Sequence, residues 1–281
     1  MSHEQFSLRY GTWAMVLGAA QGLGESFANK LAQRGINVCL VDMQEEGLIR
    51  VAAEIRNTYQ VKSHTIVVDL AGKEAITPLV DWLSATKDCR LFVYSAAYGP
   101  VKMFLDNEPE ELDRYVDTNA RSLIQLAHAF SRQLVSINAS GGMIFISSLA
   151  GLWGTSLVSP YGATKAFDWN LGESLNYELA SFDIDVLAVC AGAMDTPHYL
   201  STEPQYGKLK PSVQRSDDVA EQSLQSLGKR AFFIPGFGNR FTYFFLGRVL
   251  PRVWAVRLLN KTMMRMYKIK WQPEKWLKND I

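Results

Sequence analysis

The stretch Trp13-Ala-Met-Val-Leu17-Gly18-Ala-Ala-Gln-Gly22-Leu-Gly24 is an apolar run that leads into a glycine-rich turn. A helical pattern follows and ends at Gly35, so the turn joins a strand to a helix. Glycines let the backbone bend tightly and let an anion approach the free N–H groups of the helix N-terminus. A plain strand–helix turn is the alternative, but it does not need three glycines in this spacing. The stretch therefore predicts a dinucleotide-binding turn.

Outward from this turn, short apolar runs alternate with helical patterns. The expected strands are residues 13–17, 37–41, 63–68, 90–94, 142–146, 184–189 and 231–234. The expected helices are residues 23–34, 44–59, 74–86, 110–137, 161–182 and 217–227. Apolar strands separated by helices predict a parallel sheet that is covered on both faces. The predicted fold is α/β, a single doubly wound Rossmann-fold domain over residues 1–238, with a basic helical extension over residues 239–281.

Composition agrees with one large domain, since 48% of the 281 residues are hydrophobic and 20% are charged. The three cysteines, Cys39, Cys89 and Cys190, are far apart and are interpreted as small buried thiols. The four histidines have no ligand spacing, so no metal site is expected. The N-terminus shows no signal sequence, and no apolar stretch reaches about 18 residues, so we expect a cytoplasmic protein.

Two acids stand at ends of predicted strands, where a doubly wound sheet binds its ligands. Asp42 ends the second strand, where its carboxylate would accept hydrogen bonds from the adenosine ribose and repel a 2′-phosphate. This favours NAD, with NADP as the second option; a solvated acid at a strand end is the alternative. Asp69 ends the third strand, where it would bond the adenine amine, with Leu70 packed on the ring.

Tyr161-Gly-Ala-Thr-Lys165 places a phenol and an ammonium on one helical face. Such a pair is close to a chance occurrence, so its significance depends on the residues around it. Ser148 follows a predicted strand and lies 13 residues before Tyr161, and Asn119 lies in the preceding long helix. Singly, Ser148 could be a cap, Asn119 a mid-helix polar residue and Lys165 a surface lysine. To explain the pattern without an active site, all three of these alternatives must be true at once, and next to a glycine turn. A single active site is therefore favoured.

With these residues the chain resembles the short-chain dehydrogenases/reductases over about residues 10–236. The glycine turn, Asp69, the four residues above, Ala191-Gly192 and Thr196 carry the resemblance. The opening Tyr10-Gly-Thr-Trp-Ala and the segment Arg56-Asn-Thr-Tyr-Gln-Val look most like the branch with 17β-hydroxysteroid dehydrogenases and 3-ketoacyl reductases. The resemblance implies an NAD(P)-dependent enzyme that interconverts a secondary alcohol and a ketone, with a steroid, 3-oxoacyl or other lipid-like substrate.

The resemblance also implies roles for the site residues. Tyr161 would be the general acid or base, and Lys165 would stabilise its phenolate and bind the nicotinamide ribose. Ser148 would bond the substrate oxygen, and Asn119 would hold a water in a proton relay. The implied coenzyme contacts are Gly18, Gln21, Gly22, Leu23, Gly24, Asp42, Asp69, Leu70, Ala96, Tyr161, Lys165, Gly192 and Thr196. A homodimer or homotetramer is expected.

The chain departs from the family pattern in three places. Leu17 replaces a threonine, Tyr94-Ser-Ala-Ala stands where the family usually has Asn-Asn-Ala-Gly, so that Ser95 replaces an amide, and Ala191 replaces a proline. None of these removes a catalytic group. The alternative function is a regulatory protein that senses the dinucleotide without turnover, and the intact set of site residues favours the enzyme over it.

The C-terminal segment is strongly basic, with eight Lys and Arg and no acid in residues 239–270. Arg257, Lys261, Arg265 and Lys268 fall on one helical face, and Val256, Leu259, Met263 and Met266 fall roughly opposite. Such a helix can lie on an anionic membrane, pack on another subunit or cover the core of its own chain. These three possibilities stay open. No nucleic-acid role is expected, because the segment lacks any recognised binding module.

Overall fold

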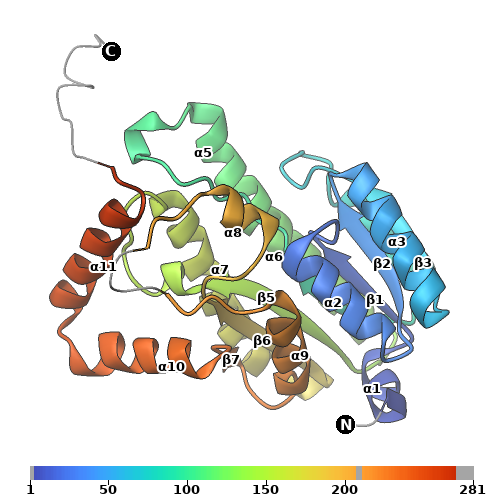
Figure 1. The fold of residues 1–281 in the computed structure, drawn as a ribbon. Helices are drawn as coiled ribbons and strands as arrows, with labels where there is room; N and C mark the ends of the chain where they lie inside the picture. Colours follow the sequence, from blue (N-terminus) through green and yellow to red (C-terminus); the bar gives the residue numbers. More distant parts are fainter. Residues whose placement is uncertain (1–2, 207–210, 270–281) are drawn as a thin grey trace.

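A computed structural model describes residues 3–206 and 211–269 of the chain. Its centre is a seven-stranded parallel sheet in the order β3-β2-β1-β4-β5-β6-β7 (Figure 1). The strands are β1 (Trp13–Leu17), β2 (Asn37–Asp42), β3 (Ser63–Val67), β4 (Cys89–Tyr94), β5 (Gly141–Ser148), β6 (Ile184–Ala191) and β7 (Phe232–Phe233). The predicted doubly wound parallel sheet is confirmed.

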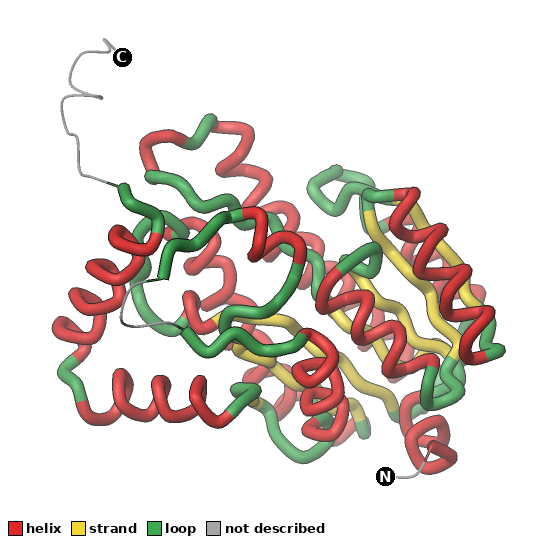
Figure 2. The backbone as a smooth tube through the Cα atoms, in the orientation of Figure 1, coloured by secondary structure: helices red, strands yellow, loops and turns green. Residues whose placement is uncertain are grey.

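Helices cover both faces of this sheet, as the tube in Figure 2 also shows. The helices are α1 (His3–Tyr10), α2 (Gly22–Ala32), α3 (Glu45–Tyr59), α4 (Thr77–Ala85), α5 (Pro109–Val116), α6 (Ser122–Ser136), α7 (Ser159–Glu178), α8 (Pro197–Ser201), α9 (Ser216–Ser226), α10 (Phe237–Phe244) and α11 (Arg252–Met266). The core has two layers, with α2, α3 and α9 on one face and α4, α6 and α7 on the other.

The central strand β1 explains why the strands are nearly continuous apolar runs. Ala14 and Val16 belong to one core layer, whereas Met15 and Leu17 belong to the other. Successive side chains of a strand point to opposite faces, and here both faces are buried. Because β1 lies between β2 and β4, the strand order reverses beside it, and this reversal opens a crevice at the carboxyl ends of the strands.

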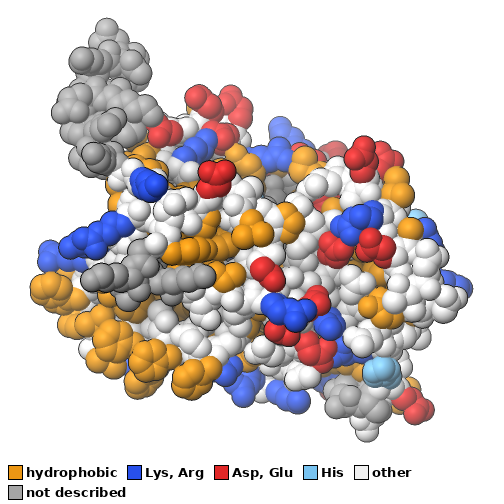
Figure 3. Space-filling view, viewed as in Figure 1, with side chains coloured by type: hydrophobic (Ala, Val, Ile, Leu, Met, Phe, Trp, Pro, Cys, Tyr) orange, Lys and Arg blue, Asp and Glu red, His pale blue; other side chains and the backbone are white. Residues whose placement is uncertain are grey.

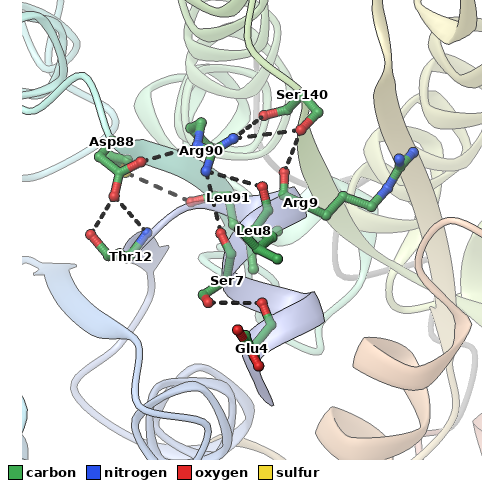
Figure 4. Close-up of polar contacts among 10 residues, drawn as sticks. Glu4, Ser7, Leu8, Arg9, Thr12, Asp88, Arg90, Leu91 and Ser140 are labelled. Atoms are coloured by element: carbon green, nitrogen blue, oxygen red, sulfur yellow. Dashed lines mark hydrogen bonds and ion pairs between the residues drawn. The ribbon is translucent and has the colours of Figure 1, made fainter. Parts of the chain in front are cut away.

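The short helix α1, which we did not predict, is attached to the opposite end of the sheet (Figure 4). Arg90 of β4 donates to the carbonyl oxygens of Ser7 and Leu8, at 3.3 and 3.2 Å, in the last turn of α1. The same guanidinium donates to Asp88 Oδ1 at 3.1 Å and reaches Ser140 before β5. Arg90 thus fastens α1 to two neighbouring strands.

The long helix predicted over residues 110–137 is interrupted. Between α5 and α6 the chain forms a π-helical segment over Asp117–Arg121, with Asn119 at its middle and completely buried. Asp117 and Arg121 form an ion pair of 2.7 Å along this wider turn. Single π turns inside helices are frequent at functional sites. A uniform helical pattern in the sequence does not reveal such a turn.

The C-terminal helices α10 and α11 pack against the sheet domain, at the left of Figure 1. Ala255, Val256 and Leu259 of α11 join a small apolar cluster with Trp153 and Leu246. The predicted apolar face of this helix therefore covers part of its own chain. Among the described residues, no helix is both long enough and apolar enough to span a membrane.

Candidate active site

The glycine turn approaches its neighbours more closely than any side chain would allow. Gly18 has a φ of +77°, and a Cβ there would lie 2.7 Å from the backbone nitrogen of Ala96. A Cβ on Gly24 would lie 1.9 Å from the carbonyl oxygen of Gly18. The N-cap of α2, Gln21, makes no side-chain capping bond, so the first amides of α2 remain free to bind an anion. The turn therefore fits a pyrophosphate.

A crevice of about 460 Å³ extends from this turn along the carboxyl ends of the strands. Most of the predicted coenzyme contacts line it: Gly18, Gln21, Gly22, Leu23, Asp42, Asp69, Leu70, Ala96, Tyr161, Lys165 and Thr196. Gly24 lies beneath the turn, and Gly192 packs against the side chain of Asn239. These two glycines shape the walls of the crevice and do not line it.

Asp42 is nearly buried at the end of β2, where the adenosine ribose is expected. Its Oδ2 accepts from the backbone N–H of Ala20 at 3.1 Å, and its Oδ1 accepts from that of Gln44 at 3.0 Å. These bonds hold the carboxylate in place. Each oxygen keeps a second lone pair for a ribose hydroxyl, because a carboxylate offers about four acceptor sites.

Asp69 lines the same end of the crevice, but it already has partners. Its Oδ2 accepts from Arg114 Nη2 at 2.9 Å, and its Oδ1 accepts from the N–H of Ala71 at 3.0 Å. The guanidinium of Arg114 also lies over the ring of Tyr98, 5.5 Å from its centroid. A salt-bridged pair, rather than a lone acid, therefore borders the expected adenine site.

Tyr161 lies in the first turn of α7 and lines the crevice. Gly99, in the loop after β4, packs flat against its ring, since a Cβ on Gly99 would lie 2.6 Å from Tyr161 Cδ2. Lys165 follows one turn later, and its Nζ lies 5.7 Å from the centroid of the phenol ring. The structure thus brings the predicted pair together on the crevice wall.

Lys165 is not a surface lysine. It is 1% exposed, and its Nζ donates to Ile146 O at 2.7 Å and to Asp168 Oδ2 at 2.8 Å. Burial acts to lower the pKa of Lys165, but the Asp168 carboxylate and Tyr161 outweigh it and hold the pKa above its ordinary value. Lys165 therefore remains an ammonium at neutral pH, and one of its three protons is left for a ligand.

Asp168, the partner of this ammonium, is itself 1% exposed on the same face of α7. Burial raises its pKa to about 6, although the ammonium of Lys165 opposes the shift. We did not predict Asp168 as a site residue. The sequence does carry a signal, because it is an isolated acid three residues after Lys165 in the stretch Ala166-Phe-Asp-Trp169.

Asn119 braces the loop that carries Gly99. Its Oδ1 accepts from the N–H of Tyr98 at 2.7 Å, and its Nδ2 donates to Tyr98 O at 2.8 Å. Nδ2 also donates to Thr164 Oγ1 at 2.9 Å, and that hydroxyl donates to Tyr161 O at 2.8 Å. Both amide hydrogens are therefore used, and the side chain of Asn119 positions the loop and Tyr161.

Ser148 ends β5 and also acts as a cap, since its Oγ accepts from the N–H of Ala150 at 3.2 Å. A hydroxyl that accepts this bond can still donate its own hydrogen. Ser147 Oγ, one residue earlier, donates to Lys165 O at 2.6 Å. These contacts hold the end of β5 against the first turns of α7. Ser148 is not among the residues that line the crevice.

The three cysteines are free and buried, as predicted. Burial raises the pKa of the Cys190 thiol to about 12, so this thiol is unreactive at neutral pH. In the part of the chain that the structure describes, no three His, Cys, Asp or Glu side chains are arranged to hold a metal ion.

A sequence profile described as "short chain dehydrogenase" matches residues 12–207, which is more than half of the chain. The chain belongs to the short-chain dehydrogenase family. It is accordingly an oxidoreductase that acts on CH–OH groups, as the resemblance of the sequence implied. The match ends before α9, so the helices α10 and α11 lie outside it.

Curated relatives extend the comparison. The chain is 29% identical over 237 residues to a 7β-hydroxysteroid dehydrogenase of Clostridium sardiniense, covering 84% of this chain and 89% of the relative. It is 27% identical over 269 residues to the human inactive hydroxysteroid dehydrogenase-like protein 1, covering 92% of this chain and 78% of that protein.

Solved structures agree on the fold. A 7β-hydroxysteroid dehydrogenase structure superposes with a TM-score of 0.81 at 24% identity, covering 90% of this chain and 98% of the other. A short-chain dehydrogenase from Sphingobium yanoikuyae, solved in complex with NADPH, gives a TM-score of 0.73 at 26% identity and covers 80% of this chain and 88% of the other.

Proposed function

We propose that the protein interconverts a secondary alcohol and a ketone on a hydrophobic, steroid-like or lipid-like substrate, with NAD(H) as the coenzyme. The observation that carries the proposal is the placement of Tyr161 and a buried, charged Lys165 on the wall of the crevice. A protein that only sensed the dinucleotide would have no use for a phenol at this position.

The coenzyme, when bound, supplies or accepts the hydride. In ketone reduction, Tyr161 donates its phenolic proton to the carbonyl oxygen, and in alcohol oxidation the phenolate takes that proton back. The ammonium of Lys165 stabilises the phenolate electrostatically. Ser148 donates a hydrogen bond to the substrate oxygen, an interaction worth about 3 kcal/mol where such donors have been removed.

The preference for NAD rests on Asp42. Its carboxylate is held by two backbone N–H groups, so it cannot turn away from a coenzyme. A 2′-phosphate on the adenosine ribose would meet this negative charge at close range, whereas a ribose diol would donate to it. One of the similar structures was solved in complex with NADPH, and a comparison of NADH with NADPH binding distinguishes the two coenzymes for this chain.

The substrate class is supported by the relatives and by the aromatic residues in and after α8. One curated relative is named as a 7β-hydroxysteroid dehydrogenase, and another is named as an inactive hydroxysteroid dehydrogenase-like protein. Pro197 and His198, at the start of α8, line the crevice, and the hydroxyls of Tyr199 in α8 and Tyr206 after it lie 2.9 Å apart. Aromatic rings with polar tips suit an apolar substrate that carries hydroxyl or keto groups.

A spectrophotometric screen of NADH and NADPH oxidation against ketosteroid and 3-oxoacyl panels tests the proposal. We expect turnover with NADH on a hydrophobic ketone, and a loss of at least about 1000-fold in Tyr161→Phe with unchanged NADH binding. Full turnover in Tyr161→Phe would refute the mechanism. NADH binding without turnover on any substrate would favour the dinucleotide-sensing alternative, and binding of NADPH alone would refute the role of Asp42.

A further inference from the structure

The outer surface of α10 and α11 carries large apolar side chains that face solvent. They are between 41% and 78% exposed: Phe237, Phe241, Phe244, Val253, Trp254 and Leu258. In Figure 3 these helices form the lower left of the molecule, where hydrophobic side chains gather beside Lys and Arg. Contiguous apolar groups of this kind on a folded surface mark an interaction site. We name this surface the aromatic-basic face.

The arrangement on each helix is regular. Phe237, Phe241 and Phe244 recur at helical spacing and form one outward stripe, while Asn239 on the other side of α10 is buried. On α11, Trp254 and Leu258 point outward, while Ala255 is fully buried against the body. The core-facing side of α11 is therefore already satisfied by its own chain. The outward stripe is a second apolar surface that the described part of the chain does not cover.

Cations are interleaved with these apolar groups. The exposed basic residues of the two helices and the turn between them are Arg240, Arg248, Arg252, Arg257, Lys261 and Arg265. None of them forms an ion pair with a carboxylate of residues 3–206 or 211–269, and residues 222–269 contain no Asp or Glu. The Arg257 guanidinium lies 5.5 Å from the centroid of the Trp254 ring. The face is thus positive as well as apolar.

We propose that the aromatic-basic face docks on an anionic phospholipid bilayer. A bilayer interface accepts Phe and Trp rings at the headgroup level, and its acidic lipids attract Lys and Arg. A second copy of this chain fits less well, because a twofold interface would place the same uncompensated cations opposite one another. Anionic headgroups neutralise these charges and also cover the rings.

The docked face would adjoin α8, whose first residues line the crevice. The N–H of Gln205, after α8, donates to Met266 O at 2.8 Å at the end of α11. The hydroxyls of Thr202 and Tyr267 lie 3.0 Å apart. A hydrophobic substrate could then pass from the bilayer to the crevice; this consequence rests on the proposed function, whereas the docking does not.

The test is co-sedimentation of the full-length protein with vesicles of phosphatidylcholine alone and of phosphatidylcholine mixed with phosphatidylserine. We expect at least about tenfold stronger binding to the mixed vesicles. The double variant Phe241→Ser/Trp254→Ser and the double variant Arg257→Glu/Lys261→Glu should each lose at least about tenfold in this binding. Tyr177→Ser/Phe182→Ser, at exposed aromatic residues on and after α7, is the matched control and should bind like the wild type.

Two results would overturn the proposal. If Phe241→Ser/Trp254→Ser binds the mixed vesicles as strongly as the wild type, only general charge attraction operates. If light scattering shows that this variant dissociates an oligomer formed by the wild type, the face is a subunit interface. Thermal unfolding and NADH binding of each variant report whether its fold is intact, and they are independent of catalytic turnover.

Discussion

At the scale of single residues, the ion pair of Lys165 and Asp168 distinguishes this site from an isolated Tyr–Lys motif. Both side chains are almost completely buried, and the bond between them is 2.8 Å long. A buried ammonium without a partner would lose its proton, because burial disfavours the charged form. Asp168 keeps Lys165 charged without contacting the substrate, so we regard it as a positioning residue for the ammonium that stabilises Tyr161.

This arrangement predicts a specific dependence of stability on pH. Burial raises the pKa of Asp168 to about 6 in the folded protein, against about 3.9 in an unfolded chain. Between these values the folded state binds the proton more tightly, so the contribution of Asp168 to stability is full at low pH and is lost as pH rises toward 6. The loss amounts to about 2–3 kcal/mol.

The variant Asp168→Asn has no carboxyl group to titrate, so it lacks this slope. We expect the stability of the wild type relative to Asp168→Asn to fall between about pH 4 and pH 6, measured by urea unfolding. The variant should also lose activity most strongly at high pH, where Lys165 without its counter-charge releases its proton. A pH-independent stability difference, together with parallel pH profiles of activity, would show that Asp168 only fills space.

At the scale of elements, the loop after β4 and the first turn of α7 act as one unit. Asn119 holds the loop through Tyr98, Thr164 links Asn119 to the backbone of Tyr161, and Gly99 packs on the phenol ring. The position of the phenol thus depends on three segments that are far apart in the sequence.

Replacement of Gly99 by alanine tests this unit. A Cβ at Gly99 would lie 2.6 Å from Tyr161 Cδ2, so the phenol must move. A displacement of about 1 Å at a reacting group commonly costs up to about 100-fold, and we expect kcat to fall by about tenfold to 100-fold in Gly99→Ala. Gly154→Ala is the matched control, because nothing lies within 4 Å of a Cβ there. Equal kcat values for the two variants would contradict a positioning role for Gly99.

How far the sequence predicts these elements depends on whether a pattern is local. The strand–glycine turn–helix unit is local, so the sequence predicts the fold. The Tyr161–Lys165 spacing is also local, so the sequence predicts that a phenol and an ammonium lie together on one wall of the site. The π turn around Asn119 and the role of Gly99 depend on contacts between distant segments, and no periodicity records them. Asp168 is intermediate, since its spacing from Lys165 is local but its burial is a tertiary property.

At the scale of the whole molecule, the two ends of the sheet have different roles, since one forms the crevice and the other holds α1. The carboxyl ends of the strands form the crevice, whereas the amino ends are fastened by α1 and Arg90. Arg90 is held by five hydrogen bonds to Asp88, Ser140, Ser7 and Leu8, and its side chain is 17% exposed. Its charge lies at the C-terminus of α1, where it favours the helix dipole and supplies a donor to the carbonyl oxygen of Leu8.

A substitution at the amino ends of the strands should therefore lower stability and leave catalysis unchanged. In Arg90→Met the apolar stem is kept, but all five hydrogen bonds of the guanidinium are lost. Leu8 O is then left without its side-chain donor, whereas Ser7 O keeps the Gly11 N–H and the Asp88 carboxylate keeps Thr12. We expect a loss of about 2–3 kcal/mol in the free energy of unfolding. Because these contacts lie at the end of the sheet away from the crevice, kcat/KM should stay within about twofold of the wild type at a temperature where the variant is folded.

Arg215→Met, at an arginine 72% exposed with only a 3.9 Å ion pair, is the control and should change stability by less than about 0.5 kcal/mol. Loss of turnover in folded Arg90→Met would mean that α1 and the crevice are coupled through β4.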